Sequence, residues 1–174
     1  MSLPGLLIEY LMTGAVALLW VFVAVDSRNV FEIQNVQLFL LPVAYILGMI
    51  IDAFSYGLTY WPKAWVRNFA FKTANPEISE EDKMELKNND SALRTKIQKE
   101  HKEPSNEINM RKSRDRIARA MIVNSICLIV FLPNEYLTAK LLMLIVSIIC
   151  WVFFEYKSHT YFLMVQKNIN ATLA

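Results

Sequence analysis

Hydrophobic residues of this chain gather in four blocks, at positions 3–25, 36–58, 118–133 and 138–155. A helix needs about 20 mostly apolar residues to cross the hydrocarbon core of a bilayer. The first two blocks reach that length, whereas the fourth holds 18 residues and the third 16. We therefore expect an all-α fold: a polytopic membrane protein with four transmembrane helices and a helical cytoplasmic region between the second and the third.

The third block is short because it forms only part of a longer helical stretch. The segment EINMRKSRDRIARAMIVNSICLIVFL, between Ser105 and Pro133, contains neither Gly nor Pro. Its first half is basic and its second half is apolar. The segment predicts one continuous helix of about 43 Å, at 1.5 Å per residue, that projects from the cytoplasm straight into the bilayer.

A short aromatic and basic segment, YWPKAWVRNFAFK, follows the second block. Trp61, Trp65 and Phe69 recur every four positions, while Lys63 and Arg67 point elsewhere, and Pro62 suits a first helical turn. This pattern is typical of an interfacial helix, with aromatics in the headgroup layer and cations reaching lipid phosphate. Because the segment adjoins a membrane span, we expect lipid contacts and not nucleic-acid binding. The expected anchor residues are Trp61, Trp65, Phe69, Lys63 and Arg67.

The next stretch, NPEISEEDKMELKNNDSALRTKIQKEHKE, is charged and mixed in sign. Ser79 with Asp82 fits a capping-box type of helix start. Leu86, Leu93 and Ile97 leave a thin apolar stripe on an otherwise polar helix, or on two helices broken near positions 88–90. Such a run is either a solvated face or a surface that contacts another subunit. These three apolar residues are candidate partner-binding positions.

Composition agrees with a membrane protein and charge sets its orientation. The chain is 55% hydrophobic and its mean hydropathy is +0.29, both higher than in a typical soluble domain. Residues 59–119 hold fourteen of the eighteen Lys and Arg residues. Since cations collect on the cytoplasmic side, we expect both termini in the cytoplasm and the connections 26–35 and 134–137 outside. The expected divisions are 1–58, 59–117, 118–155 and 156–174.

Charged residues also occur where the membrane segments meet the cytoplasmic side. In the expected topology Asp52, Glu9 and Glu155 share one layer with Arg116 and Arg119. An unpaired charge in hydrocarbon costs upward of about 2.5 kcal/mol, and pairing with Arg removes much of that cost. We expect a charged belt that clamps the helix ends, with Asp52 paired to Arg119 or Arg116 at its centre. The alternatives are that each side chain extends to the headgroups, or that Asp52 relays protons or ions.

Small residues in the apolar blocks predict close helix packing. They are Gly14, Ala15, Ala17, Pro42, Ala44, Gly48 and Ser147. Four spans enclose little volume and no inverted repeat is visible, so we do not expect one chain to act as a transporter. A pore would need several copies, and we expect a homo-oligomer in either case.

Residues of the common catalytic and metal-binding motifs are not arranged for chemistry here. The sequence shows no nucleophile–base pair, phosphate loop, HExxH or Cys-x-x-Cys. Arg94 and His101 have the R-x6-H spacing of HEPN-type ribonucleases, which any charged helix can produce. Cys127 and Cys150 are expected to lie too far apart to pair. We therefore expect no enzyme, no cofactor and no metal site.

The layout of the chain resembles small four-helix membrane proteins of bacterial antiviral defence systems, such as the membrane subunit of the Kiwa system. The resemblance rests on LGMIIDAFSYG, on SRDRIARAMIVN at the start of the third span and on the short outer turn PNEYL. It implies an oligomer in the bacterial inner membrane that works with a cytoplasmic effector docked on residues 72–115. Two functions stay open: a scaffold, sensor or effector subunit that recruits a soluble partner, or a homo-oligomeric pore that permeabilises the membrane.

Overall fold

The computed structural model describes residues 3–25, 36–74 and 102–173. These residues are helical almost throughout, which agrees with the all-α prediction. They form α1 (Leu3–Ala24), α2 (Val36–Ala74), α5 (Lys102–Phe131), the short 3-10 helix η2 (Asn134–Tyr136) and α6 (Leu137–Leu173).

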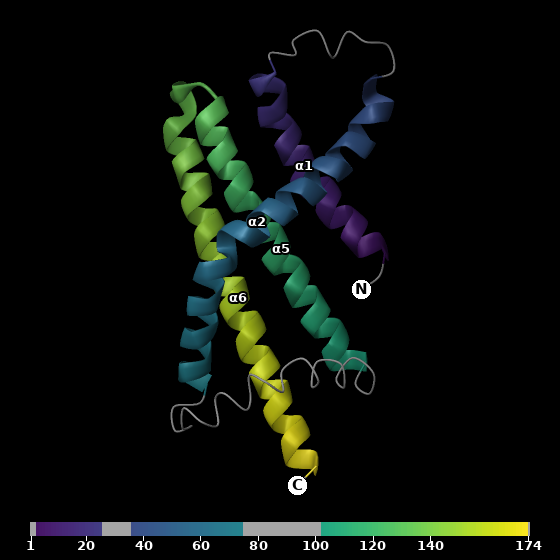
Figure 1. Ribbon diagram of the computed structural model, residues 1–174, viewed down its shortest axis with the longest axis vertical. Coiled ribbons are helices and arrows are strands. Elements are labelled where there is room, and N and C mark those ends of the chain that lie inside the picture. Colours follow the sequence, from purple (N-terminus) through teal and green to yellow (C-terminus); the bar gives the residue numbers. More distant parts are fainter. Residues whose placement is uncertain (1–2, 26–35, 75–101, 174) are drawn as a thin grey trace.

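Two helix pairs make up the bundle (Figure 1). Helices α1 and α2 cross each other as an X, while α5 and α6 run antiparallel and are joined through η2. The first half of α2 packs on α1, its middle crosses α5 and its second half lies beside α6. Helix α2 therefore connects the two pairs.

The crossing of α1 and α2 brings two backbones into contact. A Cβ atom added to Gly14 would overlap the carbonyl group of Ala44, and one added to Gly48 would overlap the carbonyl group of Tyr10. Only glycine leaves room for this approach. Small residues commonly allow such close contact between the backbones of membrane helices. Gly14, Ala17, Ala44 and Gly48 are buried as their small size predicted, whereas Ala15 is exposed.

Helix α2 runs without interruption from Val36 to Ala74, so the expectation of a separate interfacial helix after residue 58 is wrong. Pro62 lies inside the helix and not in a first turn. Proline has no amide hydrogen and clashes with the preceding turn, which bends a helix without necessarily ending it. Figure 1 shows α2 changing direction between its two halves, and this bend carries the second half from α1 towards α6.

Helices α1, α2 and α6 are long and apolar enough to cross a membrane, over Gly5–Ala24, Leu38–Thr73 and Asn134–Lys167. Helix α5 does not qualify by itself, because charged residues fill its first half. It is nevertheless one continuous helix, as its lack of Gly and Pro after Ser105 predicted, and Pro104 lies in its first turn. The helices also run across each expected division at 58/59, 117/118 and 155/156.

A buried lysine of α6 caps the C-terminal end of α5. Lys140, on the first turns of α6, is 4% exposed. Its ammonium group donates hydrogen bonds to the carbonyl oxygens of Ile129, Leu132 and Pro133, at 3.4, 2.9 and 3.2 Å. The last carbonyls of a helix lack partners within the helix and carry partial negative charge. Lys140 thus satisfies the C-terminal end of α5 and fixes the hairpin tip.

Replacing Lys140 by methionine is expected to lower the free energy of unfolding by about 2 kcal/mol, because hydrogen bonds to a charged donor are lost and carbonyl groups stay buried. Unfolding in mixed detergent micelles, followed by far-UV circular dichroism, measures the change. Glu135→Gln at the exposed hairpin tip is the control and should unfold like the wild type. Equal stability of the two variants would contradict the capping role.

Candidate functional site

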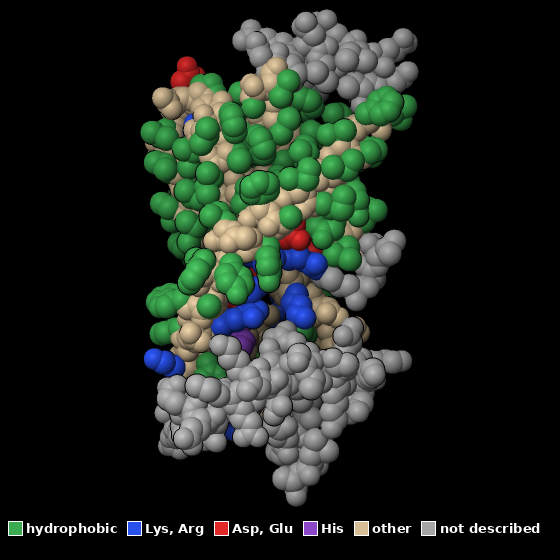
Figure 2. Space-filling view, in the orientation of Figure 1, with side chains coloured by type: hydrophobic (Ala, Val, Ile, Leu, Met, Phe, Trp, Pro, Cys, Tyr) green, Lys and Arg blue, Asp and Glu red, His purple; other side chains and the backbone are tan. Residues whose placement is uncertain are grey.

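Charged side chains gather in one layer inside the bundle. Figure 2 shows hydrophobic side chains over the upper half of the molecule and a band of Lys, Arg, Asp and Glu side chains directly below it. Among the described residues, eight of these side chains form ion pairs between different helices. They are Glu9 of α1, Asp52, Lys63 and Arg67 of α2, Asp115, Arg116 and Arg119 of α5, and Glu155 of α6.

Six of the eight form a row in which positive and negative charges alternate. Arg67 bonds to Glu155, and Lys63 Nζ lies 3.2 Å from Glu155 Oε2 and 3.2 Å from Asp115 Oδ2. The row continues through Arg119, whose Nε is 3.7 Å from Asp115 Oδ2 and whose Nη2 is 3.5 Å from Asp52 Oδ1. This row joins α2, α5 and α6.

The remaining two charges join α1 to α5. Arg116 Nε lies 3.1 Å from Glu9 Oε2, and the Ser113 hydroxyl donates a hydrogen bond to Glu9 Oε1. Glu9 is buried although it belongs to a helix that could cross a membrane. All four long helices are therefore tied together in the same layer, which we call the ion-pair network.

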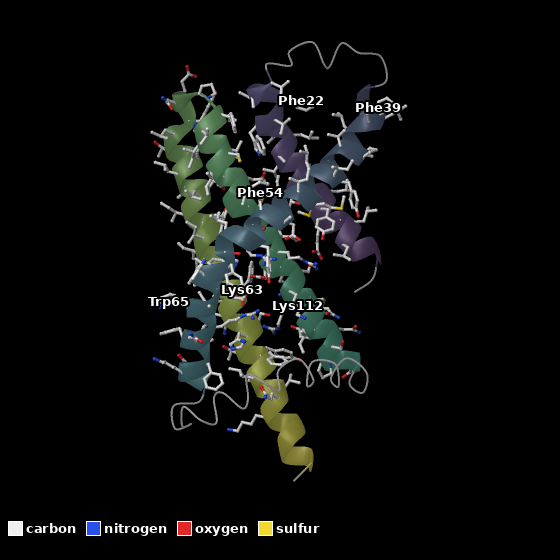
Figure 3. All side chains as sticks on the ribbon, in the orientation of Figure 1. Phe22, Phe39, Phe54, Lys63, Trp65 and Lys112 are labelled. Carbon is white, nitrogen blue, oxygen red and sulfur yellow. The ribbon has the colours of Figure 1, made fainter. Side chains whose placement is uncertain are left out.

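Helical spacing explains which side chains reach this layer. Lys63 and Arg67 are four residues apart on α2, and Asp115 and Arg119 are four apart on α5, so each pair shares a helix face. The second half of α2 lies beside α6 (Figure 1), and Lys63 and Arg67 on it contact carboxylates of α5 and α6. Figure 3 shows Lys63 on the inner side of α2 and Trp65 on its outer side.

The five residues predicted to form a charged belt all lie in the network, and Asp52 has one of its two expected partners, but it is not the centre of the network. Asp52 is near Arg119, whereas Arg116 is paired with Glu9. Asp52 lies at one end of the row with 20% of its side chain exposed, and Lys63 occupies the centre. Sequence reasoning missed Asp115 altogether. Its position one helical turn before Arg119, on the face that continues into the buried side of α5, was the available signal.

The expected interfacial anchor divides between two faces of α2. Trp61, Trp65 and Phe69 are exposed, Trp61 by 82%. Lys63 and Arg67 point towards the bundle, although 40% of the Arg67 side chain is still exposed. They bind buried carboxylates of α5 and α6. The reason is that α2 stays helical through this region and packs its cationic face on the bundle.

The charges of the network balance. Its four cations and four carboxylates sum to zero, and Asp115, Arg119, Glu9 and Glu155 are almost fully buried. Charges removed from water cost several kcal/mol each unless opposite charges and hydrogen bonds compensate. The opposite charges come from different helices. The cost of burying each charge is therefore compensated only while all four helices stay in place.

Above the network, buried uncharged polar side chains form hydrogen bonds or close polar contacts between helices. Asn124, which is fully buried, donates from its amide to the carbonyl oxygen of Thr13 at 2.9 Å and accepts from Trp20 Nε1 at 3.0 Å. Ser125 and Ser147 have their hydroxyl oxygens 3.5 Å apart between α5 and α6. These contacts fix the register of the helices.

Several sequence-based candidates lie outside the described residues. Leu86, Leu93, Ile97, Arg94 and His101 all belong to the segment 75–101. Within residues 3–25, 36–74 and 102–173, no cluster of three or more His, Cys, Asp or Glu side chains could hold a metal ion. Cys127 and Cys150 are both free thiols.

Comparison with known proteins gives no relative for this chain. No family model matches it, and neither does any curated protein or any solved structure.

Proposed function

We propose that this protein is an oligomeric scaffold, sensor or effector subunit of the bacterial inner membrane that recruits a soluble partner on its cytoplasmic side. The observation that carries this proposal is the continuation of α5 and α6 beyond the ion-pair network. Below that layer Ile108 of α5 packs with Phe162 and Val165 of α6. The guanidinium group of Arg111 lies 4.5 Å from the ring centroid of Tyr161.

The dimensions support a membrane part and a projecting part. From Leu137 to the network at Glu155, α6 rises about 27 Å, close to the thickness of a hydrocarbon core of about 30 Å. From Glu155 to Leu173 it rises about another 27 Å. Helix α5 accompanies it over about 20 Å, between Lys102 and Asp115. A packed helix pair that leaves the membrane is a suitable platform for a second protein.

Orientation and biological role follow as parts of the same proposal. Residues 59–119 carry fourteen of the eighteen Lys and Arg residues, which favours the cytoplasmic side for the end of α2, for the start of α5 and for both termini. The resemblance to membrane subunits of bacterial antiviral defence systems supports a role in recruiting a defence effector. The segment with Leu86, Leu93 and Ile97 connects α2 to the platform and supplies the apolar contacts to the partner.

Native mass spectrometry of the protein purified from its own membrane in mild detergent tests this function. We expect a homo-oligomer with a stoichiometric soluble protein bound. Simultaneous alanine substitution of the three apolar residues should release the soluble protein and leave the homo-oligomer. A matched control on the same segment replaces three cations, Lys87, Lys96 and Lys99, by alanine. A homo-oligomer that carries no soluble protein in any sample would contradict the proposal.

The alternative function is a homo-oligomeric pore. It is favoured by the row of six charged side chains, which runs between two partly exposed positions, Arg67 at one end and Asp52 at the other. A potential-sensitive dye separates the two functions, because expression of a pore depolarises the cell and expression of a scaffold does not. Loss of that depolarisation in Asp52→Asn, at equal protein level, would favour the pore.

A further inference from the structure

Three helices meet at the ammonium group of Lys63. Asp115 of α5 and Glu155 of α6 each place one carboxylate oxygen 3.2 Å from Lys63 Nζ. The side chains of Asp115 and Glu155 are only 6% and 3% exposed. Two buried carboxylates from different helices thus share one cation.

The two carboxylates are not equally supplied with hydrogen-bond donors. Glu155 also binds Arg67, which is not shared with another carboxylate in the network. For Asp115 the second cation is Arg119, at 3.7 Å, and Arg119 lies closer to Asp52. The second carboxylate oxygen of Asp115, Oδ1, is buried without a hydrogen-bond partner among the described residues. A buried carboxylate with few donors favours its neutral form.

The surroundings of Asp115 also favour its neutral form. Burial, followed by the negative charge of Glu155, raises the pKa of Asp115 to about 6, against the opposing effect of Lys63 and Arg119. Asp115 lies before the apolar second half of α5. On α1 the nearest network charge is Glu9, which is paired with Arg116. His159, one turn beyond Glu155 on α6, belongs to a residue type that titrates in the same pH range.

We propose that Asp115 and Glu155 together form a proton-binding site that controls how firmly α5 is held against α6. Asp115 takes one proton from solvent, and its new O–H group donates to the carboxylate of Glu155. Lys63 and Arg67 then pair with one negative charge, that of Glu155, instead of two. When the proton leaves, two carboxylates compete for Lys63 and repel each other across the α5–α6 contact.

The direction of the pH effect follows from the two pKa values. The pKa of Asp115 is higher in the folded protein than the ordinary value of 3.8. The folded state therefore binds this proton more tightly than the unfolded state, and acidification stabilises it. Between pH 8 and pH 5 the folding equilibrium constant is expected to rise about tenfold from this one group. Stability gained in this way is lost again as the pH rises above about 6.

Unfolding of the full chain in mixed micelles, measured at several values between pH 5 and pH 8, tests the site. We expect the tenfold gain in wild type and in His159→Gln, which removes the histidine one turn beyond Glu155. It should disappear in Asp115→Asn, which should also be more stable than wild type at pH 8. Glu107→Gln, a carboxyl of α5 that pairs with Arg111 in the projecting part, is the matched control and should keep the gain.

Infrared spectroscopy of the wild type gives a second measurement that does not depend on the folding of a variant. The spectrum should contain the C=O stretching band of a protonated buried carboxyl group at pH 5, and this band should be absent at pH 8. A folding constant that stays equal or falls between pH 8 and pH 5 in His159→Gln overturns the proposal. An unchanged gain in Asp115→Asn, or the lack of a pH-dependent carboxyl band, does so as well.

Discussion

Replacing Gly14 by alanine is expected to separate α1 from α2 and to lower the free energy of unfolding by at least about 3 kcal/mol. The added methyl group would overlap the backbone carbonyl of Ala44, which cannot rotate away as a side chain can. Overpacking of a well-packed contact usually costs about 1–3 kcal/mol, and more where backbone must move. Gly48→Ala should have the same effect, since its methyl group would meet the carbonyl of Tyr10.

Gly57→Ala is the matched control for this prediction. Gly57 lies on the same helix as Gly48, but apart from its chain neighbours and its own helix backbone, no described atom lies within 4 Å of a Cβ added there. Alanine should leave stability unchanged or raise it by up to about 1 kcal/mol, because alanine favours the helix over glycine. Unfolding in mixed micelles compares the three variants. Similar stabilities for Gly14→Ala and Gly57→Ala would show that α1 and α2 do not approach each other as described.

The second large effect is expected for Glu155→Gln, with a loss of about 3–5 kcal/mol in the free energy of unfolding. Glu155 is the carboxylate to which both Lys63 and Arg67 bind. Its neutralisation leaves Arg67 without its partner in the network and Lys63 with Asp115 alone. Removing one member of a buried ion pair leaves an uncompensated charge, which costs far more than the pair itself contributes.

Asp52→Asn provides the comparison within the same network. Asp52 is at the end of the row, is partly exposed and lies 3.5 Å from Arg119 in their ion pair. Its loss should cost no more than about 1 kcal/mol, as for other partly solvated pairs. The midpoints of unfolding in mixed micelles rank the two variants. If Asp52→Asn proved the more damaging change, Asp52 and not Lys63 would be the centre of the network.

Much of the fold could be predicted from local patterns. The lack of Gly and Pro after Ser105 predicted one long α5 helix, because nothing in that stretch breaks helical hydrogen bonding. Small residues predicted the close approach at Gly14 and Gly48, because only the absence of a side chain allows two backbones to meet. Both features depend on neighbours along the chain or on side-chain size alone.

The pairing inside the network could not be predicted in the same way. Spacing placed Lys63 and Arg67 on a face different from that of Trp61, but spacing does not say which face meets the bundle. That choice depends on the bend of α2 and on the carboxylates of α5 and α6, which are far away in the sequence. Asp115 was overlooked for a related reason, since it lies among five basic residues in RKSRDRIAR and looks solvated in the linear sequence.

The zero net charge of the ion-pair network also restricts how this sequence can change over generations. At the pairs Arg67–Glu155 and Arg116–Glu9, a substitution that removes one member leaves the other without its network partner, so the first of two successive changes is the harmful one. Surface charges elsewhere carry no such penalty and can drift singly. These four positions are therefore expected to vary as two separable opposite-charge pairs, whereas Asp52 and Asp115 can be neutralised singly.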